Sequence, residues 1–468
     1  MSSAAQSSGK SSGGQLEERV DLSSEADAKI EQAKELAGSG SSSALSDALS
    51  LLAALEKRCR VGNDTPSLVR VCEASLDLCR DAGDAESLLA TLKTLVTRRS
   101  QKSKAIEALV QKCLPWVVDG TDGYTPLPVP DSEAKGRDAL VEELRNVTDG
   151  KMYLEAERAR LTRAVAILRE ASGDVAGAAD VLHEVHVETY GSISKREKVE
   201  FILEQMRITL MRKDYVRAHI VSNKVKRSTL EEEGMAELKV KFYDLLVAYH
   251  RHDRDALELA RCYHAIYSTA SVQDDEAKWK EALTNTVLFL CLAEYSNHVK
   301  DMMVRIDADS KLELIPECKE TLGLYLRDEI IHHPTPHQAA LESVPAFSEG
   351  DDGEDGAAPA EHWRETFRTR IVQHNLRTVS VYYRQIRTTR LAQLLSLSPE
   401  EAERHISAMV SGGTLYAKID RPADVVRFSR RRSEEEVLSD WASDIKGLLG
   451  LVEETTYLIH KENMVAGH

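Results

Sequence analysis

The 468-residue chain is poor in aromatic residues and has no long apolar run. Phe, Trp and Tyr together make up 5 % of the residues although 42 % are hydrophobic, so aliphatic side chains must build the core. Leucine, alanine, valine and isoleucine mixed with glutamate, lysine and arginine favour helices. The sequence therefore predicts a mainly α protein, long enough for two or three domains.

Cysteine is also scarce, and no two cysteines form a CxxC pair. The seven are Cys59, Cys72, Cys79, Cys113, Cys262, Cys291 and Cys318. An odd, scattered set predicts reduced and mostly buried thiols, as in cytosolic or nuclear proteins. The first residues, MSSAAQSSGKSSGG, lack the apolar core of a signal peptide, and the longest apolar run, 287–293, is too short for a bilayer. We expect an intracellular protein without membrane contact.

The chain has fewer basic than acidic residues, 61 against 77, and its formal net charge is −16. Phosphate contacts supply most of the non-specific affinity for nucleic acid, and they require a basic surface. The charge balance makes nucleic acid an unlikely partner without naming another one.

Motifs of common catalytic centres are missing. The sequence has no GxSxG, no P-loop and no GxGxxG. The histidines at 332, 333 and 337 are interrupted by Pro334 and Pro336, which break a shared helix face. The segment DVLHEVHVE has the spacing H-E-x-H instead of the HExxH of zinc proteases. We therefore predict no catalytic residue, no cofactor and no metal site.

A repeat with a period near 40 residues is the main internal pattern. Three polar turns between apolar helical segments carry Asp174, Asp214 and Asp253, which stand 40 and 39 residues apart. Each turn precedes a helix that contains alanine, and a fainter copy ends at Asp84. Such self-similarity is typical of a TPR-like helical-repeat solenoid, whereas unrelated hairpins with evenly spaced turns are the simpler alternative.

Composition divides the rest of the chain. We expect residues 1–44, rich in Ser and Gly, to form a disordered tail with one short helical stretch near 25–36. The solenoid is assigned to 45–340, with a Gly- and Pro-rich loop at 119–135. A second loop is expected at 332–360, and an acidic Gly/Pro-rich linker is assigned to 341–362, where the segment SEGDDGEDGAAPA lies.

Residues 363–432 predict a winged helix. An amphipathic helix over 363–383 precedes a strand at 385–387 and a short helix through RLAQLLSL. Ser398 with Glu401 then predicts a capping box for a helix that ends at Gly412 and Gly413. Strands at 415–419 and 425–428 flank a turn at 420–423, the wing.

The winged helix does not resemble one that reads DNA. Glu400, Glu401 and Glu403 stand against Arg404 on the candidate recognition helix, where such motifs meet phosphates and base edges. The arginines at 427 and 430–432 form a basic cluster beside Glu434–Glu436, which we interpret as a solvated, charge-balancing edge.

The last segment, 433–468, predicts one long helix with an apolar stripe. Ser433 and Glu436 form a capping box that sets its start. The stripe consists of Leu438, Trp441, Ile445, Leu448, Val452, Thr455 and Ile459. A rod of about 45 Å at the end of a chain has little of its own domain to pack on. Because Gly447 and Gly450 each cost roughly 1 kcal/mol of helix stability, we expect this helix to need a partner.

A helical array, a winged helix and a long terminal helix together resemble the PCI-domain proteins. The stretches that carry the resemblance are ERARLTRAVAILREASGDVAGAADVLHEVHVETYGSIS, KREKVEFILEQMRITLMRKDYVRAHIVSNKV, HNLRTVSVYYRQIRTTRLAQLLSLSPEEAE, LYAKIDRPADVVRF and LLGLVEETTYLIHKENM. They look most like the members of the family that build the proteasome lid, and the resemblance covers roughly 45–465. The Ser/Gly-rich start and the acidic linker depart from it.

The resemblance implies a non-catalytic scaffold for ubiquitin-dependent degradation in the cytoplasm and nucleus. Implied partners are other PCI lid subunits, lid deubiquitinase subunits, the ATPase ring and the 20S core. In the family, winged helices line up edge to edge and terminal helices gather into one bundle. Carried over by position, the bundle contact falls on the apolar stripe of the last helix, from Leu438 to Ile459. The winged-helix edge falls on Ile386, Leu415, Tyr416, Ile419, Val425 and Phe428.

Two alternatives stay open. The chain also fits a PCI scaffold subunit of the COP9 signalosome, with different partners and the same physics. An RNA-binding PCI protein of translation initiation or mRNA export is a third class, against which the net charge and the acidic helix argue.

Overall fold

The computed structural model describes residues 22–37, 44–119, 123–128, 131–348, 359–429 and 433–466. Helices dominate these residues and a single small sheet accompanies them, which confirms the predicted mainly α fold. The chain divides into two compact units, 1–249 and 250–468, and the boundary falls inside helix α11 (Ala236–Asp253).

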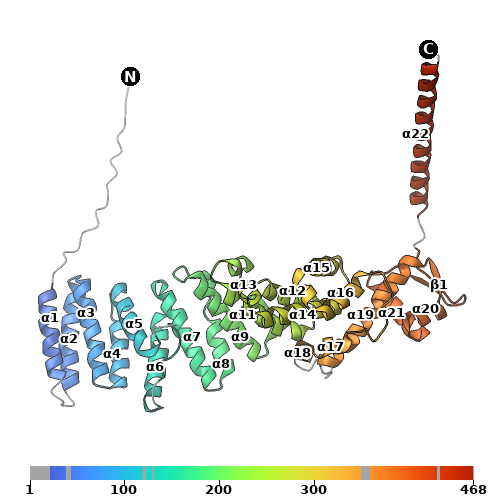
Figure 1. Cartoon of the computed structure of the whole chain (residues 1–468). Helices are drawn as coiled ribbons and strands as arrows, with labels where there is room; N and C mark the ends of the chain where they lie inside the picture. Colours follow the sequence, from blue (N-terminus) through green and yellow to red (C-terminus); the bar gives the residue numbers. More distant parts are fainter. Residues whose placement is uncertain are drawn as a thin grey trace, which may run out of the picture. The chain divides into compact units, whose positions relative to one another are not determined.

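The first unit is an array in which successive helices lie side by side (Figure 1). Its α-helices are α1 (Ser23–Ala37), α2 (Ala44–Val61), α3 (Thr65–Asp81), α4 (Ala85–Thr97), α5 (Ser103–Val117), α6 (Asp131–Thr148), α7 (Glu155–Ala171), α8 (Val175–His183), α9 (Lys195–Met211) and α10 (Tyr215–Ser222). Short 3-10 turns are η1 (Met152–Leu154), η2 (Val187–Thr189) and η3 (Arg227–Glu231). One core, with fully buried leucines such as Leu52, Leu109 and Leu161, runs from α1 into α8.

Five turns of the chain share one local design. The last residue before the aspartate of each turn has positive φ; these residues are Asn63, Gly83, Gly173, Lys213 and Arg254. The aspartate that follows donates its backbone N–H to the carbonyl five residues earlier, at 2.9–3.4 Å. This is the long hydrogen bond of a Schellman motif, which ends the preceding helix.

The same aspartates begin the next helix. The side chains of Asp84, Asp174, Asp214 and Asp255 accept hydrogen bonds from backbone N–H groups of the first turn. The third aspartate of the predicted repeat is therefore Asp255. Asp253 is instead the last residue of α11, so that assignment was wrong by two residues.

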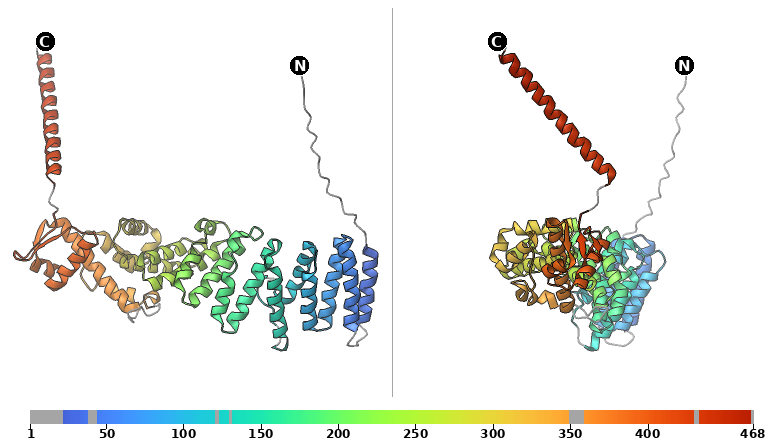
Figure 2. Two further views of the ribbon diagram at one scale, coloured as in Figure 1. Left: turned by 180° about the vertical axis from the view of Figure 1, so that it is seen from behind. Right: turned by 90° about the vertical axis from the view of Figure 1, so that its right-hand side faces the viewer.

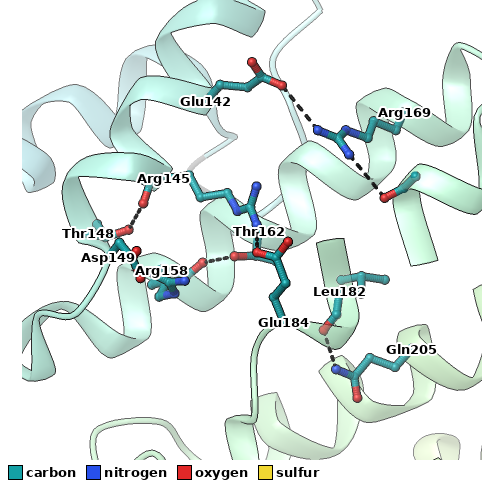
Figure 3. Close-up of polar contacts among 11 residues, drawn as sticks. Glu142, Arg145, Thr148, Asp149, Arg158, Thr162, Arg169, Leu182, Glu184 and Gln205 are labelled. Carbon is teal, nitrogen blue, oxygen red and sulfur yellow. Dashed lines mark hydrogen bonds and ion pairs between the residues drawn. The ribbon is translucent and has the colours of Figure 1, made fainter. Parts of the chain in front are cut away.

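Polar side chains tie neighbouring helices of the array together (Figure 3). Arg145 of α6 forms an ion pair with Glu184, which follows α8. Gln205 of α9 is buried, and its side-chain amide donates to the Leu182 carbonyl of α8 at 2.6 Å. These contacts satisfy polar groups at the helix ends and fix how far one helix slides along the next.

Two arginine–glutamate pairs repeat at the period of the array. Arg160 pairs with Glu197 at 2.8 Å, and Arg207 pairs with Glu170 at 2.6 Å; each pair is separated by 37 residues. The hydrogen bond from Arg207 lowers the pKa of Glu170. A constant separation means that equivalent positions of consecutive helical pairs face each other, as expected for a solenoid.

The second unit continues with helices and ends with the sheet. Its α-helices are α12 (Ala256–Tyr267), α13 (Ala270–Gln273), α14 (Glu276–Leu292), α15 (Asn297–Asp307), α16 (Pro316–Leu326), α17 (Gln338–Glu342), α18 (Pro345–Ser348), α19 (Pro359–Tyr382), α20 (Thr388–Leu395), α21 (Pro399–Ser411) and α22 (Glu434–Ala466), with the 3-10 turn η4 (Ser310–Leu314). Helix α14 is its centre, packed by α12, α16 and α19.

Helix α19 links the winged helix to the helices before it. Arg370 donates to the Leu292 carbonyl at the end of α14, at 3.0 Å. The Asn375 side chain accepts from the Ile331 N–H and donates to the Ile331 carbonyl, both at 2.8 Å. Asn375 is buried, so both of these bonds replace water.

Two expectations about chain organisation need correction. Within the expected tail, α1 is a formed helix that packs on α2 and α3, and its Ala26 and Ala33 are fully buried in the core. The described array therefore begins at Ser23; residues 1–21 and 38–43 lie outside the described residues. A Ser/Gly-rich composition concealed a helix whose buried face is built of alanine, which gives a weak apolar signal.

The expected loops are also shorter than predicted. Helix α6 begins at Asp131, inside the loop assigned to 119–135. The segment assigned to the acidic linker contains the end of α17, all of α18 and the start of α19, and Phe347 of α18 is buried. Only part of that linker, 349–358, lies outside the described residues.

The winged helix has the predicted order of elements (Figure 2). Strands β1 (Gln385–Arg387), β2 (Lys418–Asp420) and β3 (Val425–Arg427) form an antiparallel sheet in the order β1-β3-β2, with Ile386 opposite Val426 and Ile419 opposite the same residue. Helices α19, α20 and α21 close a core around Leu376 and Leu391. Strand β2 is shorter than the predicted 415–419 because the chain pairs only from Lys418 onward.

Candidate assembly surfaces

The terminal helix α22 begins where the sequence predicts. The Ser433 hydroxyl accepts from the Glu436 N–H and the Glu436 carboxylate accepts from the Ser433 N–H, both at 3.1 Å, which is a complete capping box. Figure 2 shows α22 as one unbroken helix. Every side chain from 434 to 465 is exposed.

The predicted stripe is therefore uncovered along its length. Trp441 is 63 % exposed and Leu448 is 62 % exposed, and the remaining members are exposed as well. The surface exceeds by far the scattered apolar residues that a soluble monomer tolerates. The described residues provide no packing for this face, and the two interior glycines lower the intrinsic stability of the helix.

The apolar face is wider than the stripe predicted from the sequence. At 3.6 residues per turn, Val437 and Leu449 flank the stripe and broaden it to roughly 120°. Both are exposed. Leu451 and Leu458, also exposed, lie outside this face on one side. Strict three–four spacing overlooked these four residues, and a helical-wheel projection finds them.

The six predicted edge residues of the winged helix fall into two groups, one buried in the core and one half-buried or exposed. Ile386 and Phe428 belong to its core, so their side chains do not face a partner in this structure. Leu415, Ile419 and Val425 are half-buried, and Tyr416 is 46 % exposed.

An open groove lies between α21 and β2. Its volume is about 710 Å³, and its lining includes Val410, Ile419 and Arg421. Strand β2 is an edge of the described sheet, so the backbone groups on its outer side are not paired with another strand of that sheet. The groove and the open strand edge make one continuous candidate surface.

Two of the three acidic residues of α21, Glu401 and Glu403, have structural partners. Glu401 closes the capping box with Ser398, and those hydrogen bonds lower the pKa of Glu401. Glu403 accepts from the Arg421 Nε at 2.8 Å, which ties the helix to the wing. The acidic character that argues against nucleic-acid binding thus belongs to helix capping and to a helix–wing ion pair. Arg430–Arg432 lie outside the described residues.

All seven cysteines are buried and none forms a disulfide, in line with the predicted reduced and mostly buried thiols. Burial raises the pKa of Cys72 and of Cys113 to about 12. A thiol with such a pKa is protonated at neutral pH and is a poor nucleophile or metal ligand.

The histidines singled out in the sequence make ordinary contacts. His183 shares a hydrogen bond of 3.2 Å with the Thr209 hydroxyl, and burial lowers the pKa of His183. His337 approaches the Glu320 carboxylate at 2.6 Å. Among the described residues, no group of three or more His, Cys, Asp or Glu side chains is arranged to hold a metal ion. The helices of the described chain include none with the length and apolarity to cross a membrane.

Three family models match consecutive parts of the chain. The model "PSMD12/CSN4, N-terminal" matches residues 47–275, the PCI domain matches 336–430, and "26S proteasome regulatory subunit RPN5 C-terminal domain" matches 435–467. The last of these coincides almost residue for residue with α22.

Curated relatives match nearly the whole chain. The 26S proteasome non-ATPase regulatory subunit 12 of Dictyostelium discoideum is 36 % identical over 95 % of each chain. The 26S proteasome regulatory subunit rpn501 of Schizosaccharomyces pombe is 37 % identical over 89 % of this chain and 91 % of its own. RPN5 of Saccharomyces cerevisiae, also named as a 26S proteasome regulatory subunit, is 33 % identical over 90 % and 92 %.

Proposed function

The chain belongs to the family of 26S proteasome regulatory subunits that includes non-ATPase regulatory subunit 12 and RPN5, and on this premise we propose how it acts as a scaffold. It is a structural, regulatory subunit of the proteasome lid. Assembly with other lid subunits follows from that role. The observation that carries the proposal is the exposed apolar face of α22, in the segment that matches the RPN5 C-terminal model.

Helix α22 acts as the assembly handle. In the free chain its apolar face is in water, and burying each large aliphatic side chain contributes roughly 1.5–3 kcal/mol. A bundle with terminal helices of other lid subunits supplies that burial. The reciprocal cap at Ser433 fixes where α22 begins without help from a neighbouring element. Packing in the bundle then stabilises the rest of the helix.

The winged helix contributes a second contact through its open edge. Supporting this are the groove between α21 and β2 and the exposed Tyr416. Ile419 lines the groove, whereas the buried Ile386 and Phe428 hold the sheet in place. Val410→Asp in the groove should weaken assembly. Ser411→Asp, at an exposed residue of the same helix outside the groove lining, should leave assembly unchanged.

We propose that the chain has no catalytic centre and serves hydrolysis by positioning others. Its cysteines are buried, and burial raises the pKa of Cys72 and of Cys113 to about 12. The deubiquitinase subunits, the ATPase ring and the 20S core are the proposed partners beyond the PCI subunits. The proposed sites of action are the cytoplasm and the nucleus, where those particles work.

A role in the COP9 signalosome is less well supported. The N-terminal family model covers both proteasome and signalosome subunits, so residues 47–275 do not separate the two. The C-terminal model and the full-length relatives carry proteasome names. RNA binding has no comparable support.

Removing 433–468 tests the proposal. The tagged full chain, purified at moderate salt, is expected to bring proteasome ATPases, a lid metalloprotease and 20S subunits, identified by mass spectrometry. The truncated chain should keep its melting temperature, because α22 is exposed throughout, and should bring none of them. Normal incorporation of the truncated chain would overturn the role of α22, and recovery of signalosome or initiation-factor subunits would overturn the function.

A further inference from the structure

Two buried polar groups of the second unit lack hydrogen-bond partners and line the same pocket. The pocket has a volume of about 350 Å³, and α14, α15, α16 and α19 contribute to its wall. The Arg377 Nη1 atom and the Tyr325 hydroxyl are both buried, and the described residues supply no partner to either. Native proteins pair nearly all buried polar atoms, so two unpaired groups at one cavity call for an explanation.

Arg377 is held in place without being neutralised. Its guanidinium carbon lies 3.4 Å from the centroid of the Tyr295 ring, a cation–π contact. That contact orients the guanidinium and leaves its N–H groups free to donate. Burial lowers the pKa of Arg377 to about 10, the direction expected where desolvation outweighs nearby negative charge. The group still carries its charge at neutral pH.

The other ionisable groups of the wall are engaged or face solvent. Arg370 donates to the Glu294 carboxylate at 3.1 Å. His374 bonds to the Glu329 carbonyl at 3.1 Å, and burial lowers the pKa of His374, which keeps it neutral. Asp328 is exposed at the margin. Arg377 is thus a half-buried cation of this wall, and its buried Nη1 atom has no hydrogen-bond acceptor among the described residues.

Apolar residues at the margin indicate a protein ligand. Val381 lines the pocket and is 71 % exposed, and the adjacent Tyr382 is also exposed. Leu415, from the loop before β2, lines it from the winged helix. A desolvated charged centre with exposed apolar residues beside it is the anatomy of an interface hot spot, in which the surrounding contacts exclude water from the charged pair.

We propose that this pocket receives the carboxylate of an aspartate or glutamate side chain from a neighbouring subunit of the particle. A carboxylate has two acceptor oxygens, which suit the fork of N–H donors on the Arg377 guanidinium. The apolar margin packs against the backbone and flanking side chains of the inserted segment. The inference rests on the proposed function, because another subunit supplies the carboxylate.

Arg377→Met separates this role from a purely structural one. The variant keeps the apolar stem and removes a buried charge that has no partner. The isolated full chain should therefore melt at the same temperature or higher. In the particle, loss of a charged hydrogen bond should lower retention of the subunit at raised salt about tenfold. Arg368→Met, at an exposed arginine of the same helix outside the pocket lining, is the matched control and should change neither.

A photo-crosslinker at the pocket margin identifies what occupies it. Benzoylphenylalanine placed at Val381 of the full chain, in the assembled particle, should crosslink to a segment of another subunit that contains Asp or Glu. Changing that acidic residue to Arg together with Arg377→Glu should restore the retention that either change alone lowers. A crosslink to a segment without an acidic residue overturns the proposal, as does a fall of several degrees in the melting temperature of isolated Arg377→Met.

Two further outcomes are separable. If sodium phosphate or sodium acetate at millimolar concentration raises the melting temperature of the isolated chain in an Arg377-dependent manner, the pocket is a small-anion site and the subunit contact is wrong. If the wild-type chain does not enter the proteasome, the proposed function fails and this inference with it. If it enters and Arg377→Met is retained like Arg368→Met, the inference alone fails.

Discussion

Helices α14 and α22 are both rich in leucine and valine, yet they stand at opposite extremes of burial. Helix α14 has 17 residues, and its Leu288 and Leu290 are fully buried among the neighbours from its own unit. Helix α22 has 33 residues, and its described side chains are all exposed. Helices with similar apolar residues thus have two different roles. Helix α14 stabilises the fold, whereas the apolar face of α22 is available to another chain.

The difference also separates folding from assembly. Substitutions in α14 should lower the free energy of unfolding. They should reduce assembly only because less of the chain is folded. Substitutions on the apolar face of α22 should leave the isolated chain intact and act on incorporation alone. The predictions below test that separation, beginning with the largest effect.

A buried and an exposed leucine give the strongest contrast. Leu288→Asp places a charge in the core of the second unit and should lower the free energy of unfolding by more than about 4 kcal/mol. Leu448→Asp should change it by less than about 0.5 kcal/mol, because the side chain is in water. Urea titration of the isolated chains, followed by circular dichroism, measures both. Equal destabilisation would mean that α22 packs on its own chain.

Substitutions of the helix-capping residues should show the same contrast between array and terminal helix, with smaller changes in stability. Asp174→Ala removes the side chain that accepts from the Gly177 N–H and should cost about 1 kcal/mol of the stability of the array. Ser433→Ala removes the equivalent bond to Glu436, and its cost should stay within α22. Amide hydrogen exchange distinguishes them: the first variant should accelerate exchange across the array, and the second only in the first turns of α22. Slower or unchanged exchange in α22 would contradict its independence.

Mild acid should weaken the folded units through buried histidines. Burial lowers the pKa of His183, His374 and His405 from the ordinary 6.5. Between 6.5 and these lower values, the unfolded chain binds protons that the folded chain does not, so stability falls as the pH falls. Denaturant titrations from pH 7.5 to 5.5 should show this decline, and His183→Asn should reduce its slope. A stability that rises toward pH 5.5 would contradict the burial of these rings.

The smallest expected effect concerns backbone strain in the turns. Lys213 has φ of 62°, in the left-handed region where the equivalent Gly173 pays no steric penalty. Lys213→Gly should stabilise the chain by up to about 1 kcal/mol, and Gly173→Ala should destabilise it by a similar amount. Thermal unfolding measures both changes. Destabilisation by Lys213→Gly would show that the Lys213 side chain contributes more than its backbone strain costs.

Much of the fold can be read from residues whose chemistry acts locally. The capping boxes at Ser398 and Ser433 and the strand at 385–387 lie where the sequence predicts them, because caps and alternation depend on near neighbours. Two differences have the opposite origin: α1 packs into the core although only a short helical stretch in a tail was expected there, and the capping aspartate is Asp255 instead of Asp253. A helix face built of alanine, as in α1, and a left-handed residue such as Arg254 both give little signal in the sequence. They become visible only in the packed structure.

The candidate surfaces were predicted to different depths. The stripe of α22 follows from periodicity, since exposure only requires that no other element covers it. The winged-helix edge came from position in a family, and burial then assigned Ile386 and Phe428 to the core. The pocket at Arg377 has no sequence signal at all. The pocket is formed by residues from four helices that are far apart in the sequence. Nothing in the sequence around Arg377 distinguishes it from the other arginines of α19.

The most direct test of the account compares two faces of α22 in the full chain. Leu448→Asp with Val452→Asp alters the apolar face, and Ser443→Asp with Lys461→Asp alters the opposite face by the same number of residues. The fraction of each chain recovered in purified proteasomes is measured by quantitative mass spectrometry. The account predicts loss of the first double variant and wild-type recovery of the second, with unchanged melting temperatures for both isolated chains. Equal recovery of the two would contradict it.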